Sequence, residues 1–141
     1  MVQERQESSR VPIRPGSLMH NTVVIAVVDD DEAIRSALNS LLRASGYRVQ
    51  TYCSARAFLE STDLDQVHCL ISDIQMPGLS GPQLHETLHA QGWRIPVIFV
   101  SAHPGAMPTR TPDVIACLPK PFQPEDLLRH IKQALNKTPP V

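Results

Sequence analysis

The chain has 141 residues, 42% of them hydrophobic, and a formal net charge of −1 at pH 7. This length suffices for one domain with a sizeable core, and the composition fits a globular rather than a disordered protein. The charge provides no basic surface for nucleic acid, and the longest apolar runs are far too short to span a bilayer. Because no basic start precedes an apolar stretch, we expect no signal peptide and a cytoplasmic location.

Both ends of the chain are polar and lack a periodic apolar pattern. We expect a flexible leader over residues 1–21, one domain over residues 22–137 and a short tail over residues 138–141. Because the expected domain begins just after Met19, that residue is an alternative candidate for the start of the protein.

Five apolar or alternating runs bounded by turn residues favour β-strands. The expected strands are Thr22–Val28, Tyr47–Cys53, Val67–Asp73, Ile95–Val100 and Val114–Leu118. Apolar residues at helical spacing between them predict helices. The expected helices run from Ala33 to about Ser45, from Ser54 as N-cap through Leu59, from Gly81 to Gln91 and from Glu125 to Asn136.

Strands that alternate with helices imply right-handed crossovers and a parallel sheet. Five such units, with strands buried on both faces, favour a single α/β domain with a doubly wound flavodoxin-like sheet of order 2-1-3-4-5. No glycine-rich fingerprint follows the first strand, and no Walker-type lysine follows a glycine loop. The sequence therefore argues against a dinucleotide site or a P-loop.

Polar side chains follow four of these strands where the strands end. Asp29 and Asp30 follow the first, Asp73 closes the third, and Ser101 and Lys120 follow the fourth and fifth. Since these strands end at one edge of such a sheet, the five side chains should converge. Clustered carboxylates repel one another unless a cation neutralises them, and Mg²⁺ or Mn²⁺ suits oxygen ligands and phosphate partners. A carboxylate beside such a cation and a lysine can attack a phosphoryl group and form an aspartyl phosphate.

At this point the sequence resembles the CheY-like receiver domain of two-component response regulators. The matching motifs are Asp29-Asp30, Asp73 with Met76-Pro77-Gly78, Ser101-Ala102 and Lys120-Pro121-Phe122. The resemblance covers about residues 23–136, and the phrase from Asp73 to Gly81 is similar to that of FixJ-type receivers attached to helix-turn-helix outputs. Each motif is weak alone, but all four at the right strand ends are highly specific.

The resemblance implies a metal site for Mg²⁺. Asp30 would bind the cation directly, and Asp29 would support the site through water. The backbone carbonyl of Gln75 would be a further ligand, and Asp73, the phosphoacceptor, would share the cation.

The resemblance also implies contacts to the phosphoryl group. Ser101 would hydrogen-bond that group, and Lys120 would pair with one of its oxygens, with a cis peptide bond before Pro121. Simpler interpretations exist for each residue taken alone: an N-cap cluster for Asp29 and Asp30, a turn-starting aspartate, a loop hydroxyl and a surface lysine. Asp31 and Glu32 we do interpret as first-turn acids.

Two features depart from the family. Prolines recur about every four residues between His103 and Asp113, and each would cost about 3 kcal/mol inside a helix. We therefore expect the helix between the fourth and fifth strands to be shortened or missing.

Cys117 stands where receivers carry a switch aromatic, and we interpret it as a small buried core residue rather than a redox sensor. The three cysteines, Cys53, Cys69 and Cys117, favour buried thiols in a reducing cytosol over a disulfide framework or a zinc site.

The resemblance predicts a stand-alone receiver that takes a phosphoryl group onto Asp73 from a sensor histidine kinase or phosphotransfer protein, in a Mg²⁺-dependent reaction. It would signal to an unidentified protein through a changed surface. That surface would be formed by the region of the helix between the fourth and fifth strands, by the fifth strand and by the last helix. No direct nucleic-acid or membrane partner is expected, and a homodimer stays open. By this interpretation the chain is a signalling domain and not an enzyme.

Two alternatives belong to other functional classes. A degenerate receiver would be a phosphorylation-independent protein-binding module, which the proline-rich stretch and Cys117 favour and the intact acidic pocket disfavours. A phosphatase or phosphotransferase with an aspartyl intermediate usually has a second aspartate two residues after the nucleophile, where this chain has Gln75.

Overall fold

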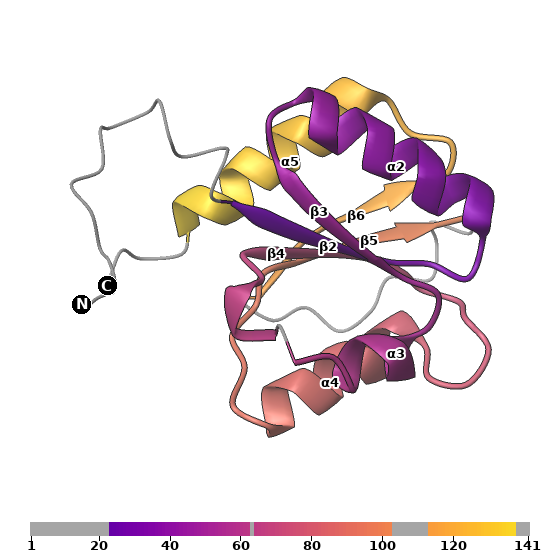
Figure 1. Cartoon of the computed structure of the whole chain (residues 1–141), viewed down its shortest axis with the longest axis vertical. Helices are drawn as coiled ribbons and strands as arrows, with labels where there is room; N and C mark the ends of the chain where they lie inside the picture. The colour runs from indigo at the N-terminus through magenta and orange to yellow at the C-terminus, as the bar shows by residue number, and fades with distance from the viewer. Residues whose placement is uncertain (1–22, 63, 103–112, 138–141) are drawn as a thin grey trace.

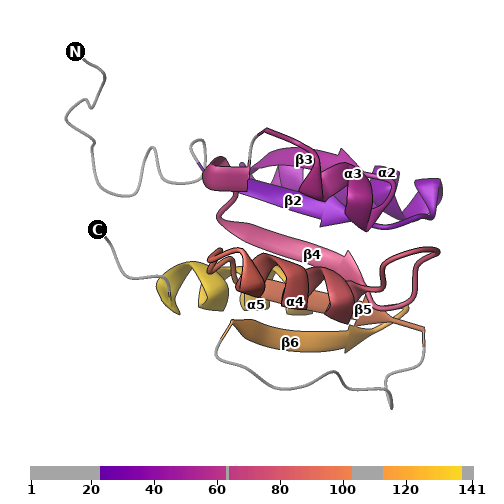
Figure 2. The same cartoon turned by 90° about the horizontal axis from the view of Figure 1, so that it is seen from below.

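The computed structural model describes residues 23–62, 64–102 and 113–137. Its centre is a five-stranded sheet in which every neighbouring pair of strands is parallel. The strands are β2 (Val24–Val28), β3 (Arg48–Tyr52), β4 (Cys69–Asp73), β5 (Val97–Ser101) and β6 (Val114–Pro119). Their order across the sheet is β3-β2-β4-β5-β6 (Figure 2), which confirms the predicted order 2-1-3-4-5.

Helices cover both faces of the sheet (Figure 1). They are α2 (Glu32–Ala44), α3 (Ala55–Leu59), α4 (Gly81–Ala90) and α5 (Pro124–Lys137), with a 3-10 turn, η1 (Leu64–Gln66). Side chains of Asp31, Ser54 and Ser80 cap the first three of these helices by accepting backbone N–H groups. The capping role predicted for Ser54 is therefore confirmed.

Two apolar layers hold the helices to the sheet. Leu42 of α2 and Ile131 of α5 pack on one face, and Phe58 of α3 and Leu84 of α4 pack on the other. Every residue of β2, β4 and β5 is buried, as expected for central strands of a parallel sheet. The edge strands β3 and β6 are partly exposed.

The cysteines divide between these environments. Cys69 is fully buried in β4, and burial raises the pKa of its thiol to about 12. Cys117 is only partly buried because β6 is an edge strand, and Cys53 is exposed just after the other edge strand, β3. All three are free thiols. The expectation that they are buried is correct for Cys69, partly correct for Cys117 and wrong for Cys53.

Three expectations fall on parts of the chain outside the described residues. These are the leader over residues 1–21, the tail over residues 138–141 and the shortened or missing helix in the proline-rich stretch, which concerns residues 103–112. Among the helices of the described ranges, none is both long and apolar enough to cross a membrane.

Candidate functional site

The register of the sheet brings the predicted site residues to one edge. Val28 pairs with Ser72, so Asp29 and Asp73 follow side by side on adjacent strands. Asp73 pairs with Val100 of β5, and Ser101 follows that residue. The backbone N–H of Lys120 donates to the carbonyl of Ser101 at 2.7 Å, which fixes the end of β6 against the end of β5.

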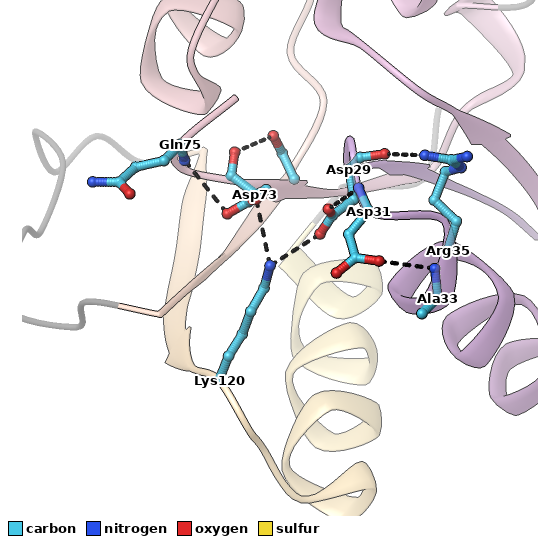
Figure 3. Close-up of polar contacts among 8 residues, drawn as sticks. Asp29, Asp31, Ala33, Arg35, Asp73, Gln75 and Lys120 are labelled. Carbon is cyan, nitrogen blue, oxygen red and sulfur yellow. Dashed lines mark hydrogen bonds and ion pairs between the residues drawn. The ribbon is translucent and has the colours of Figure 1, made fainter. Parts of the chain in front are cut away.

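The ammonium of Lys120 joins the two buried carboxylates (Figure 3). Its Nζ lies 3.1 Å from Asp29 Oδ2 and 3.4 Å from Asp73 Oδ2. Asp29 is 1% exposed and Asp73 is 8% exposed, so most of the water that would otherwise solvate these charges is absent. The lysine therefore supplies the positive charge that two buried carboxylates need. The peptide bond from Lys120 to Pro121 is cis, as predicted.

Every polar atom of Asp29 has a partner. Its N–H donates to the carbonyl of Tyr52 at 3.2 Å, and its own carbonyl accepts from Nη1 of Arg35 at 2.7 Å. Its Oδ1 accepts the N–H of Asp31 at 2.8 Å, while Oδ2 faces Lys120. The side chain of Asp30, by contrast, is exposed and has no hydrogen-bond partner among the described residues.

Burial and the charge of Asp29 raise the pKa of Asp73 above its ordinary value of 3.8. The charge of Lys120 and hydrogen bonds from Gln75 and Lys120 oppose that rise without cancelling it. The N–H of Gln75 donates to Asp73 Oδ1 at 3.4 Å, a long contact. For Lys120, burial would lower the pKa, but the hydrogen bond and charge of Asp29, followed by those of Asp73, outweigh it and raise the pKa. The cluster therefore has an excess of negative charge when both aspartates are ionised.

Asp29, Asp30 and Asp73 fit a divalent cation. Each offers a carboxylate oxygen, and these three oxygens lie within 4.8 Å of one another. Among the described residues no other group of histidine, cysteine and acidic side chains meets that criterion. Three hard, anionic oxygens suit Mg²⁺ or Mn²⁺ and suit zinc less well.

The other two predicted residues lie beside this cluster. Ser101 is 1% exposed at the end of β5. Gln75 is exposed, two residues after Asp73, and its backbone N–H faces the Asp73 carboxylate (Figure 3). The structure thus brings Asp29, Asp73 and Lys120 into direct contact.

Sequence reasoning missed Arg35 and Gly81. Arg35 reads as an ordinary polar position of an amphipathic helix, yet its guanidinium binds the backbone of Asp29. Gly81 was predicted only as the start of a helix, yet its backbone N–H donates to the carbonyl of Ile74, the residue directly after Asp73, at 2.9 Å. A glycine at N1, where many residues are tolerated, was the available signal for a close approach.

Comparisons of the sequence and of the structure with known proteins both find response regulators. The sequence profile of the response regulator receiver domain matches residues 25–132. Response regulator protein TmoT of Ectopseudomonas mendocina is 42% identical over 119 residues, which are 82% of this chain and 54% of that protein. Transcriptional regulatory protein FixJ of Bradyrhizobium diazoefficiens is 34% identical over 82% of this chain and 58% of its own length.

Among solved structures, response regulator StyR matches with a TM-score of 0.75 and 40% identity, over 82% of this chain and 60% of that one. The chain spans about half the length of TmoT and FixJ, the two curated relatives compared above. The expectation that the domain stands alone stays a prediction.

Proposed function

Because this chain belongs to the response regulator receiver family, we propose that Asp73 accepts a phosphoryl group from a phosphohistidine of a sensor kinase or phosphotransfer protein. A carboxylate oxygen of Asp73 attacks the phosphorus, the P–N bond to the donor histidine breaks, and the histidine nitrogen keeps the electron pair. Water later hydrolyses the acyl phosphate, which releases inorganic phosphate and restores the carboxylate.

The contact of Lys120 with both Asp29 and Asp73 carries this proposal. Phosphoryl transfer needs alignment and charge neutralisation more than it needs covalent chemistry from the protein. Lys120 sits where it can pair with a phosphoryl oxygen once Asp73 has reacted. Ser101, at the end of the neighbouring strand, would donate its hydroxyl to a second phosphoryl oxygen.

Asp29, Asp30 and Asp73 would hold Mg²⁺, and we assign the backbone carbonyl of Gln75 as a further ligand. When bound, the ion supplies positive charge that offsets the negative charge on the phosphoryl oxygens. Asp30 would be the most readily recruited ligand, because its exposed carboxylate has no competing partner within the described part of the chain. Asp29 also orients Lys120 and so serves both the metal and the phosphoryl group.

Signalling would follow from the phosphorylated state. We propose that residues 22–137 form the receiver, that it works in the cytoplasm, and that its phosphorylation changes a surface recognised by a downstream protein. Its own chemistry would be phosphoryl acceptance and hydrolysis, in the service of signalling.

Acetyl phosphate provides the test. Incubation of the protein with acetyl phosphate and Mg²⁺, followed by intact mass, should show one added phosphoryl group that is lost in base. Asp73→Asn should remove the label, and Asp30→Asn should reduce both labelling and metal affinity. Asp65→Asn, which changes an exposed acid on η1, is the matched control and should label normally.

Two outcomes would contradict the proposal. Undiminished label on Asp73→Asn would place the phosphoryl group elsewhere. A complete absence of label on the parent protein, with acetyl phosphate and with a phosphorylated kinase, would favour a phosphorylation-independent binding module.

A further inference from the structure

Arg35 of α2 binds the backbone of the loop that carries two of the acidic residues. Its Nη1 donates to the carbonyl of Asp29 at 2.7 Å (Figure 3), a charge-assisted hydrogen bond of near-ideal length. We propose that Arg35 is a positioning residue for the divalent cation: it fixes the Asp29–Asp31 loop so that Asp30 presents its carboxylate at the correct place. This inference rests on the proposed function, since it concerns the same metal site.

The loop from Asp29 to Asp31 has few other restraints. The N–H of Asp29 is held by Tyr52 at the end of β3, and the N–H of Asp31 is held by the Asp29 side chain. Asp31 then caps α2 through the N–H of Ala33. Arg35 is the side chain that the structure places on the Asp29 carbonyl, from the first turns of the helix that follows the loop.

Asp30 depends on this backbone for its direction. Its side chain is exposed and has no hydrogen bond or ion pair within the described ranges, so no side-chain contact orients the carboxylate. If the Asp29 carbonyl lost its partner, the peptide plane between Asp29 and Asp30 would keep only the restraints on its two sides. It could then tilt further and would carry Asp30 with it. Groups that orient metal ligands in this indirect way typically change metal affinity by about 10- to 100-fold.

The positive charge of Arg35 and its hydrogen bond should have opposite effects on metal affinity. A cation near a metal site repels the incoming metal, so loss of that charge alone should strengthen metal binding. Loss of a positioning contact should weaken it. The sign of the change in affinity therefore separates the two roles of Arg35.

Mn²⁺ is a suitable probe, because free Mn²⁺ is measured directly by its electron paramagnetic resonance signal. We expect Arg35→Met, which keeps an apolar stem but no donor, to bind Mn²⁺ about tenfold more weakly than the parent. Arg35→Lys, which keeps a donor, should stay within about threefold of it. Arg43→Met removes the same charge from the exposed last turn of the same helix and should not change affinity.

Thermal unfolding of each variant shows that the comparison is made on folded protein. Should Arg35→Met not fold, Arg35→Leu, which also lacks the charge and the donor, is compared in the same way. An affinity of the neutral variant equal to or above that of the parent would overturn the positioning role while leaving the metal site intact. No Mn²⁺ binding by the parent protein, or no loss in Asp30→Asn, would instead overturn the metal site itself.

Discussion

Gly81 packs directly on the backbone carbonyl of Asp73. A Cβ at position 81 would collide with that oxygen and would also lie 3.0 Å from the ring of Phe99 and 3.1 Å from Ser72 Oγ. The first residue of α4 therefore touches Asp73 at the end of β4. Any residue larger than glycine must push the helix or the strand aside.

Gly81→Ala should lower the free energy of unfolding by about 1–3 kcal/mol, the usual effect of overpacking. Without the close contact the same change at this first helical position should be neutral or slightly stabilising, because alanine is the better helix former. Urea denaturation distinguishes these signs, and labelling by acetyl phosphate should slow because Asp73 is displaced. Gly92→Ala is the control: it has open space and a φ of +91°, so it should cost about 1–2 kcal/mol in backbone strain and leave labelling unchanged. A Gly81→Ala protein as stable as the parent would contradict the contact.

Asp73→Asn should make the protein more stable at pH 7. Burial and Asp29 raise the pKa of Asp73 in the folded state above 3.8. As the pH rises from 3.8 through the raised value, this carboxyl loses its proton more readily in the unfolded chain than in the folded one. Its ionisation therefore lowers the stability of the fold. An uncharged asparagine removes this effect. The stabilisation should therefore shrink as the pH is lowered toward about 4, as measured by urea denaturation at both pH values. Asp65→Asn, at an exposed site, should change stability by less than about 0.5 kcal/mol; a loss of stability in Asp73→Asn at pH 7 would refute the argument.

Lys120→Met should separate metal binding from phosphorylation. The ammonium competes with a divalent cation for the oxygens of Asp29 and Asp73, so its removal should strengthen Mn²⁺ binding. Labelling by acetyl phosphate should nevertheless slow by about 100-fold, because in the proposed mechanism the charge of Lys120 stabilises the transition state. Lys132→Met, an exposed change on α5, should alter neither. Labelling at the parent rate would remove Lys120 from the proposed mechanism.

His68 should make stability depend on pH between about 7.5 and 5.5. Its Nδ1 accepts the N–H of Val24 at 3.1 Å, and burial lowers the pKa of the imidazole below 6.5. Because the unfolded chain takes up the proton first, stability is complete above about 6.5 and decreases as the pH falls through that value toward the lower, folded pKa.

The matched variant for this effect is His68→Asn, whose side-chain oxygen can accept the same N–H without titrating near neutral pH. Urea denaturation at about pH 7.5 and 5.5 should show a smaller pH effect for His68→Asn than for the parent. His68→Ala removes the acceptor of a hydrogen bond that is only partly buried, and it should cost about 0.5–1.5 kcal/mol at the higher pH. An identical pH dependence in His68→Asn and the parent would show that other groups are responsible.

The sequence was sufficient for the sheet and for the convergence of Asp29, Asp73 and Lys120, because apolar strands that end in charged residues define both a core and an edge. It was insufficient for contacts that depend on the orientation of one element against another. Arg35 reaches Asp29 only because α2 packs beside β2 with its first turns toward the loop. The expected third strand began at Val67, whereas β4 begins at Cys69. At His68 the imidazole, rather than a backbone carbonyl, accepts the N–H of Val24.

The position of Lys120 between two buried carboxylates determines how the domain should respond when the magnesium concentration changes. The resting domain contains its own counterion, so the carboxylates are partly neutralised before any metal arrives. We therefore expect folding to be independent of the metal, and a chelator such as EDTA should stop phosphorylation without unfolding the chain. Under the proposed function, a fall in available magnesium would stop phosphorylation reversibly, and the protein already made would accept phosphoryl groups again as soon as the ion returned.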